Sequence, residues 1–166
     1  KIYEKLKKFE ETGTLSLLER IRSNPRIQLN KIYGIGTKKA DELVTKHNIT
    51  SIAELKENQH LLNQKQKIGL EYYEDIETRI PREEIIKHER YMKRMLPEDS
   101  GLIMEIVGSY RRGAKTSGDI DVIFTHQNES DGLRAFKDYI DRLKESDYIT
   151  HILAKGNKTS MFIAKL

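Results

Sequence analysis

Two aspartates, Asp119 and Asp121, stand two residues apart in a stretch of alternating polar and apolar residues. The alternation over residues 119–126 predicts a β-strand, in which side chains at i and i+2 share one face with Cβ atoms roughly 6–7 Å apart. Two carboxylates this close raise each other's pKa unless a cation lies between them. Because Mg²⁺ takes one or two carboxylates and fills its shell with water and phosphate oxygens, the pair predicts a magnesium site facing a phosphorylated substrate.

A glycine-rich, basic stretch precedes the aspartates and carries groups that bind phosphate. Gly108 and Ser109 follow an apolar run, residues 102–107, that predicts a buried strand. The dipeptide therefore predicts the start of a short helix, whose free N–H groups, positive dipole end and Ser109 hydroxyl suit a terminal phosphate. Each half of the pattern is weak alone, because Asp119 and Asp121 fit equally well on an edge strand with a polar outer face.

Two arginines and two further glycines complete this stretch. Arg111 and Arg112 offer forked donors for phosphate oxygens, although only one of two neighbours on a helix faces a given site. Gly113 and Gly118 allow tight turns between the phosphate-binding part and the aspartates. The order of strand, Gly-Ser, basic turn and Asp-x-Asp strand is therefore more specific than any of its parts.

A helix, a Gly-Ile-Gly turn and a second helix are predicted over residues 29–43. Gly34 and Gly36 allow positive φ and a close approach of ligand to backbone, and Thr37 is placed to cap the second helix. Two lysines follow the turn, Lys38 and Lys39. The pattern resembles a helix-hairpin-helix, which binds DNA phosphates through backbone amides without base preference, and it also fits a plain helical turn closed by glycines.

The remaining periodicity predicts an α+β protein whose first half is all-helical. Helices are predicted at residues 2–12, 15–24, 49–64, 66–79, 81–95 and 132–145, and further strands at residues 148–154 and 159–165, joined by a turn with Gly156 and Asn157. In the second half we expect a mainly antiparallel sheet with helices on one face. His126 and His151 fall at predicted strand ends, and we interpret them as surface residues rather than metal ligands.

Charge and composition limit the function. The 166 residues carry a net charge of +4, and residues 1–50 hold 11 Lys and Arg against 6 Asp and Glu, whereas residues 51–100 hold 9 against 11. Basic charge therefore gathers in the first part, as binding to a DNA backbone requires. The absence of cysteine excludes disulfides and thiolate zinc sites. No apolar run approaches the ~20 residues of a membrane span and no signal peptide is present, so we expect a soluble intracellular protein without membrane partners.

The sequence Gly-Ser-Tyr-Arg-Arg-Gly followed by Gly-Asp-x-Asp, within residues 108–121, resembles the nucleotidyltransferase superfamily and, within it, the beta-type members of the X family of DNA polymerases. Residues 64–84, which end in Thr-Arg-Ile-Pro-Arg-Glu-Glu, resemble the segment that joins the DNA-binding subdomain to the catalytic palm. The resemblance implies the end of a lyase-type helical domain at residues 1–22, a helix-hairpin-helix subdomain at residues 23–80 and a partial nucleotidyltransferase palm at residues 81–166. Because the chain also begins inside a helical pattern without an initiator Met, we interpret it as a fragment.

The resemblance also implies roles for individual residues. Two Mg²⁺ ions are held by Asp119 and Asp121, and the triphosphate is bound by Ser109, Arg112, Gly118 and Arg79. A Na⁺ or K⁺ ion joins the backbone carbonyls of Asn30, Ile32 and Ile35 to a DNA phosphate, beside the DNA-binding residues Gly34, Gly36, Lys38 and Lys39. Lys5 takes the position of the family's Schiff-base lysine but also fits a solvated basic face, and Arg79 also fits a surface arginine at a helix end.

The implied function is a DNA-directed DNA polymerase that fills short gaps in base excision repair, with 5′-deoxyribose-phosphate lyase activity in the full-length protein. Expected partners are gapped or nicked DNA, deoxynucleoside triphosphates and repair proteins, and we expect a nuclear monomer. The family's third carboxylate, which accepts the proton of the primer hydroxyl, comes from a strand beyond Leu166, so we expect the fragment alone to be inactive. Two alternatives share parts of the pattern: a template-independent nucleotidyltransferase, which would not need the hairpin, and a non-catalytic DNA-binding protein, which would not need paired carboxylates.

Overall fold

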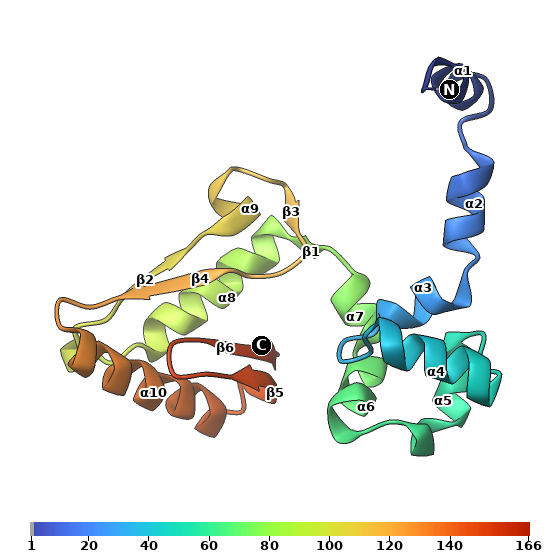
Figure 1. Cartoon of the computed structure of the whole chain (residues 1–166). Helices are drawn as coiled ribbons and strands as arrows, with labels where there is room; N and C mark the ends of the chain where they lie inside the picture. The colour runs from blue at the N-terminus through green and yellow to red at the C-terminus, as the bar shows by residue number, and fades with distance from the viewer. Residues whose placement is uncertain (1) are drawn as a thin grey trace. The chain divides into compact units, whose positions relative to one another are not determined.

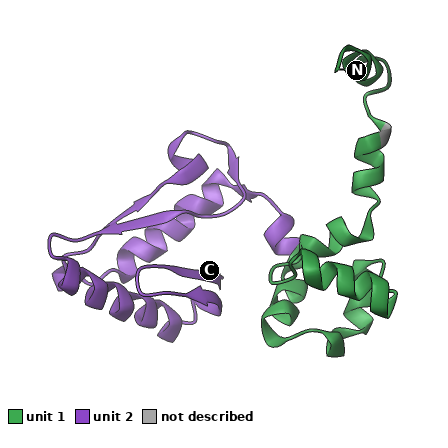
Figure 2. Cartoon of the chain, viewed as in Figure 1, with its two compact units in different colours: residues 1–73 green, residues 74–166 purple. Residues whose placement is uncertain are grey.

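The computed structural model describes residues 2–166, apart from the side chain of Ser16. The chain divides into two compact units, residues 1–73 and 74–166 (Figure 2). The described part of the first unit is helical, and the second combines helices with short antiparallel strands. The predicted α+β class with a helical first half is therefore confirmed.

The first unit begins with two helices, α1 (Ile2–Thr12) and α2 (Ser16–Arg22) (Figure 1). α1 ends where the sequence predicts, because Gly13 adopts a left-handed φ of +67° and its N–H donates to the Phe9 carbonyl at 2.8 Å. The apolar side of α1 is exposed, with 78% of Ile2 and 48% of Phe9 accessible. No residue of the described chain buries this side.

Five helical segments and one core make up the rest of the first unit. They are α3 (Pro25–Asn30), α4 (Thr37–His47), α5 (Ile52–Glu57), the 3₁₀ turn η1 (Gln59–Leu61) and α6 (Gln64–Glu71). Asn24 caps α3 by accepting from the Arg26 N–H at 3.0 Å. The core consists of Leu29, Ile32, Ile35, Ala40, Leu43, Ile49, Leu55, Leu62 and Leu70. Ile35, between the two glycines of the turn after α3, is 3% exposed and belongs to this core.

The single helix predicted over residues 66–79 is wrong. α6 ends at Glu71, and α7 (Tyr73–Glu77) begins after Tyr72, whose φ of −96° and ψ of 15° leave the α-helical range. Because α7 ends at Glu77, Arg79 lies in the connection that follows it and not at a helix end.

Three two-stranded antiparallel sheets form the strands of the second unit (Figure 1). β1 (Ile80–Pro81) pairs with β3 (Thr116–Ser117), β2 (Ile103–Ile106) with β4 (Val122–Thr125), and β5 (Ile149–Lys155) with β6 (Ser160–Ala164). The helices are α8 (Arg82–Met95), the 3₁₀ turn η2 (Glu98–Ser100), α9 (Gly108–Arg111) and α10 (Glu129–Glu145). The hairpin predicted near the end of the chain is confirmed, with strand ends shifted by one residue.

α8, β2, α10 and the start of β5 share one apolar core. Its buried members are Ile85, Met92, Leu102, Met104, Ile106, Tyr139, Ile140, Leu143, Tyr148 and Ile149. Tyr139 donates its hydroxyl to the Met92 carbonyl at 2.8 Å, and His88 lies 2.7 Å from the Tyr148 hydroxyl. Burial holds the pKa of His88 below its usual value. The core thus includes polar side chains whose hydrogen bonds fix α8 against α10 and β5.

The strand predicted over residues 119–126 is shorter than expected. β4 begins at Val122, which pairs with Ile106, and the Val107 N–H donates to the Asp121 carbonyl at 2.9 Å as the last contact of the ladder. The segment that follows β2, the strand paired with β4, turns away at Gly108, where φ is +60°. Asp119 therefore has no strand opposite it and lies in a bend before the strand.

Three smaller expectations are also corrected. Pro81 pairs in β1 and precedes α8, so the helix begins at Arg82. α10 begins at Glu129, because Asn128 caps it by accepting from the Asp131 N–H at 3.1 Å. β2 is buried on one face only, since Ile103 is 67% exposed.

Candidate active site

The glycine loop (residues 108–118) connects β2 to β4 and begins against an aspartate. A Cβ added at Gly108 would lie 1.9 Å from Oδ2 of Asp121, and Gly108 also has a left-handed φ of +60°. Both facts require glycine, because a side chain would overlap the carboxylate and strain the backbone. The structure therefore places the Asp121 carboxylate directly on the backbone at the start of α9.

Asp119 and Asp121 are both exposed, and neither forms an ion pair with any residue of the described chain. They do not share the face of one strand, as the sequence predicted, because both aspartates precede β4, which begins at Val122. Two exposed carboxylates with free oxygens still suit a hard cation that keeps part of its water shell. Within residues 2–166, no group of three His, Cys, Asp or Glu side chains is placed to hold a metal ion.

Ser109 is held by a second serine that the sequence analysis did not single out. Its hydroxyl donates to Oγ of Ser117 at 2.8 Å, and Ser117 is only 1% exposed. The Ser109 carbonyl also accepts from the Ala114 N–H at 3.1 Å. The only signal in the sequence was a serine in a polar loop. Its burial could not be predicted, because Ser117 lies in β3 and β3 pairs with β1, a distant segment of the chain.

The two arginines of the glycine loop differ in their contacts. Arg111 pairs with Glu105 of β2, with 3.0 Å between Nη1 and Oε1. Arg112 is exposed and forms no ion pair within the described chain. Arg112 is therefore the arginine whose guanidinium is not committed to a carboxylate.

Arg79 contacts the far end of the glycine loop. Its Nε donates to Oγ1 of Thr116 at 2.7 Å, and its Nη2 donates to the carbonyl of the same residue. Gly118 follows β3 and is exposed, with no atom within 4 Å of a Cβ added there. The structure thus brings Arg79 to the same loop as Ser109 and Arg112.

Tyr110, in the single turn of α9, is bound to α8. Its hydroxyl donates to Oε2 of Glu89 at 3.1 Å, while Lys93 donates to Oε1 of Glu89 at 2.7 Å. The hydrogen bond from Lys93 lowers the pKa of Glu89, against the effect of partial burial. Burial, followed by the contact with Glu89, raises the pKa of Tyr110.

The Gly-Ile-Gly turn (residues 31–36) joins α3 to α4 in the first unit and uses one left-handed glycine. Gly34 has a φ of +85°, and a Cβ there would lie 3.3 Å from Cγ of Lys65. Gly36 has a φ of −84°, so its predicted positive φ is wrong, and no atom lies within 4 Å of a Cβ added there. Gly36 is itself the N-cap residue of α4, so the expected cap by Thr37 is also wrong. The space beside Gly36 is open to a ligand.

α6 holds the Gly-Ile-Gly turn by direct backbone approach. A Cβ at Gly69 would lie 2.0 Å from the Tyr33 carbonyl oxygen, so only glycine fits. The side-chain amide of the buried Gln66 donates to the Gly34 carbonyl at 3.1 Å. Lys65 lies 4.9 Å from the centroid of the Tyr33 ring, which adds a cation beside the turn that the sequence analysis missed.

The other predicted residues of the first unit lie where their elements place them. Lys38 is exposed, whereas Lys39 pairs with Glu42 at 3.0 Å and thereby lowers the pKa of that carboxyl. Asn30 ends α3, and the Ile32 carbonyl accepts from the Ile35 N–H at 2.9 Å. Lys5 is exposed on α1, which buries none of its residues.

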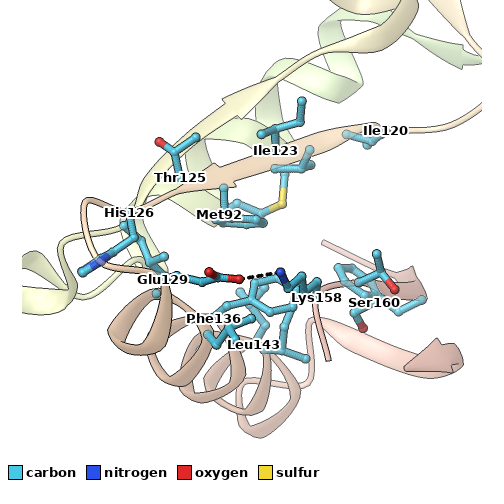
Figure 3. Close-up of a pocket in the computed structure, with 18 of the residues that line it drawn as sticks. Met92, Ile120, Ile123, Thr125, His126, Glu129, Phe136, Leu143, Lys158 and Ser160 are labelled. Carbon is cyan, nitrogen blue, oxygen red and sulfur yellow. Dashed lines mark hydrogen bonds and ion pairs between the residues drawn. The ribbon is translucent and has the colours of Figure 1, made fainter. Parts of the chain in front are cut away.

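A separate cavity of about 740 Å³ lies between β4, α10 and β6 (Figure 3). Its lining is largely apolar, with Val122, Phe124, Phe136 and Phe162 among the members. Lys158 and Glu129 form an ion pair of 2.6 Å in the lining. Asp119, Asp121 and the glycine loop are not part of this cavity, so it is distinct from the candidate active site.

None of the helices in the described part of the chain has the length and hydropathy of a membrane span.

Comparison with known proteins identifies the class. Residues 79–166 match the model of the DNA polymerase beta palm, and residues 27–77 match the model of the fingers domain of DNA polymerase lambda. DNA polymerase lambda of Arabidopsis thaliana is 34% identical over 143 residues, which are 83% of this chain and 27% of that protein. DNA polymerase lambda of Rattus norvegicus is 32% identical over 150 residues, 89% of this chain and 26% of that protein. DNA-directed DNA/RNA polymerase mu of Homo sapiens is 28% identical over 124 residues, 72% of this chain and 25% of that protein.

The second unit is thus a palm of the DNA polymerase beta type. The chain belongs to the X family of DNA polymerases, which confirms the family that the Gly-Ser and Asp-x-Asp stretch predicted. It spans about a quarter of the length of the curated relatives that it matches.

Proposed function

We propose that the chain supplies the nucleotide-binding palm and a DNA-binding subdomain of a DNA-directed DNA polymerase. One observation supports this most directly: the Asp121 carboxylate lies against Gly108, so that a cation ligand and the start of the glycine loop adjoin. A cation there would meet the phosphates held by the loop. Membership of the X family points to deoxynucleoside triphosphates and gapped or nicked DNA as substrates.

Asp119 and Asp121 would hold Mg²⁺, because their oxygens are exposed and unpaired within the described chain. Bound there, Mg²⁺ would supply charge stabilisation for in-line transfer of a nucleotidyl group. Four residues would bind the triphosphate: Ser109 through its hydroxyl, Arg112 and Arg79 through their guanidinium groups, and Gly118 through its backbone. Arg79 directs two of its five N–H donors to Thr116, so three remain for phosphate oxygens.

The Gly-Ile-Gly turn would act as a helix-hairpin-helix. The open side of Gly36 lets a DNA phosphate approach the backbone, and Lys38 lies exposed beside it. Lys39 contributes less charge, because Glu42 pairs with it. The backbone carbonyls of Asn30, Ile32 and Ile35 would bind Na⁺ or K⁺, and the Ile32 carbonyl keeps one lone pair for this after accepting from Ile35.

The cellular role we propose is gap filling in base excision repair, in the nucleus and with repair proteins as partners. In the complete polymerase Lys5 would be the Schiff-base lysine of a 5′-deoxyribose-phosphate lyase. Such an amine needs burial or neighbouring cations to lower its pKa. Because Lys5 is exposed on α1, further residues would have to cover it.

A third carboxylate would come from another strand of the complete polymerase. Within the described chain, β4 pairs only with β2, β6 pairs only with β5, and the cavity between them is largely apolar. The buried hydroxyl of Ser160 in its lining has no hydrogen-bond partner among the described residues. A further strand in this cavity would pair with the free edges of β4 and β6. It would lie beside β4, which directly follows Asp121.

Magnesium-dependent nucleotide binding tests this proposal. We expect the chain to bind a deoxynucleoside triphosphate more tightly with Mg²⁺ than with EDTA in equilibrium dialysis. Asp121→Asn should remove the magnesium dependence, whereas Asp138→Asn, the same change at an exposed position on α10, should keep it. Nucleotide binding that is indifferent to Mg²⁺ would contradict the assignment of the aspartates.

A further inference from the structure

Four consecutive residues, 79–82, hold the far end of the glycine loop. β1 pairs with β3 in the register Ile80 to Ser117, and Arg79 donates to Thr116. The N–H of Arg82, the first residue of α8, donates to the Lys115 carbonyl at 3.0 Å. The start of the palm helix and the return of the loop are therefore fixed to each other.

The side chain of Arg82 reaches further into the loop than its neighbours. Its Nη1 donates to the carbonyl oxygen of Tyr110 at 2.8 Å and to that of Ala114 at 3.3 Å. Its guanidinium carbon lies 4.0 Å from the centroid of the Tyr110 ring, within cation–π range. The half-buried side chain of Arg82 thus connects Tyr110, at the start of the loop, to Ala114, further along it.

Both ends of the Tyr110 side chain are tied to α8. Arg82 stacks on the ring, and Glu89, two turns further along the helix, accepts the hydroxyl hydrogen at 3.1 Å. Lys93 holds the other oxygen of Glu89 at 2.7 Å. The network consists of groups with complementary charge, so the position of Tyr110 is fixed relative to the helix.

Two of the residues proposed to bind the triphosphate lie within or next to the segment, residues 110–114, that Arg82 holds. Arg112 stands between the two carbonyls that Arg82 binds, and Ser109 directly precedes Tyr110. Carbonyl oxygens repel phosphate oxygens, so directing two of them to a cation removes repulsion and fixes the turn.

We propose that Arg82 is a positioning residue that holds the glycine loop in its phosphate-binding conformation and so sets the affinity for the incoming nucleotide. This inference rests on the function proposed above. Arg82 would act before chemistry and without contact to the reacting atoms, so its loss should weaken nucleotide binding much more than it slows the bound complex.

Lysine cannot replace arginine here. A guanidinium group is planar, stacks on an aromatic ring and presents donors in a fixed fork, whereas an ammonium group is a point charge on a flexible stem. The charge-conserving change Arg82→Lys therefore separates positioning from general electrostatics.

The test is gap filling by the complete polymerase that contains this chain. We expect Arg82→Lys and Arg82→Met to raise the KM for the nucleotide by about tenfold or more, with kcat within about threefold of the wild type. Arg90→Met is the matched control, because Arg90 is an exposed arginine of the same helix. It should keep both constants.

Tyr110→Leu provides a second arm that does not depend on Arg82→Met folding. The change removes the ring but keeps the backbone carbonyl, so Arg82→Lys should cost less in the Tyr110→Leu background than in the wild type. A wild-type enzyme without activity would overturn the proposed function itself. If the wild type is active, three results would each overturn the positioning role. These are an unchanged KM in Arg82→Lys, a loss confined to kcat, and an effect of Arg82→Lys that is equally large in the wild-type and Tyr110→Leu backgrounds.

Discussion

Gly108→Ala should damage the palm in two separable ways. The first is backbone strain, because φ at this position is +60° and a non-glycine residue there costs about 1–2 kcal/mol. For a domain of this size each kcal/mol lowers the melting temperature by roughly 4–8 °C. We therefore expect the melting temperature of the second unit to fall by about 4–16 °C.

The second effect is displacement of the Asp121 carboxylate. The new Cβ would lie 1.9 Å from Oδ2, whereas ordinary contacts begin at 3.4 Å. The carboxylate must therefore move by about 1.5 Å, and a misplacement of about 1 Å costs roughly 10²-fold in rate. We expect kcat/KM for gap filling to fall by at least ~10²-fold in the complete polymerase.

Gly113→Ala is the matched control for this prediction. Gly113 also has a left-handed φ, +83°, but no atom lies within 4 Å of a Cβ added there. It should lose similar stability in a thermal unfolding experiment and retain most of the gap-filling rate. If the two variants lose activity equally, or if Gly108→Ala keeps wild-type activity, the contact between Gly108 and Asp121 has no functional role.

Three further predictions concern other parts of the chain. Gly36→Val should cost only about 1 kcal/mol of stability, because valine is a poorer N-cap residue than glycine but the backbone is extended and the surroundings are open. The change should weaken gapped-DNA binding about equally for all sequences in a fluorescence anisotropy titration. Gly34→Val, at a φ of +85°, should lose more stability. A sequence-dependent loss in Gly36→Val would refute the phosphate contact. Because burial lowers the pKa of His88, its stabilising contribution is complete above its ordinary value of 6.5 and is lost as pH falls from there towards the folded-state pKa; His88→Gln should therefore flatten the dependence of the urea midpoint between pH 7.5 and 5, and an unchanged slope would contradict this. The chain by itself should bind DNA with steep salt dependence and show no primer extension in a gel assay, and extension that is lost on Asp121→Asn would refute the need for a third carboxylate.

The sequence predicts repeating patterns well and contacts between distant segments poorly. The ends of α1 and of the β5–β6 hairpin follow from local signals, Gly13 in one case and the Gly156-Asn157 turn in the other. The strand predicted from Asp119 was too long, because the alternation of polar and apolar residues continues there, whereas pairing with β2 stops where the chain turns at Gly108. Alternation of polar and apolar residues is a property of one strand, whereas a β-ladder requires hydrogen bonds to a second strand.

The candidate site shows the same division. Asp121 and Ser109 could be chosen from residue type and order, because the chemistry requires a carboxylate and a hydroxyl there. Arg82 and Ser117 could not, since each matters through a partner at least eight residues away in the chain. Gly36 was assigned the wrong φ because a Gly-x-Gly turn does not reveal which glycine carries the left-handed conformation.

The most direct measurement of the central claim is single-nucleotide gap filling by the complete polymerase with Asp121→Asn, beside Asp138→Asn as control. Both changes remove one exposed carboxylate charge, but only Asp121 adjoins the glycine loop. The structure predicts that Asp121→Asn abolishes nucleotide incorporation and keeps gapped-DNA affinity within about threefold, while Asp138→Asn remains at the wild-type rate. Incorporation by Asp121→Asn near the wild-type rate would contradict the assignment of this loop and its aspartates as the active site.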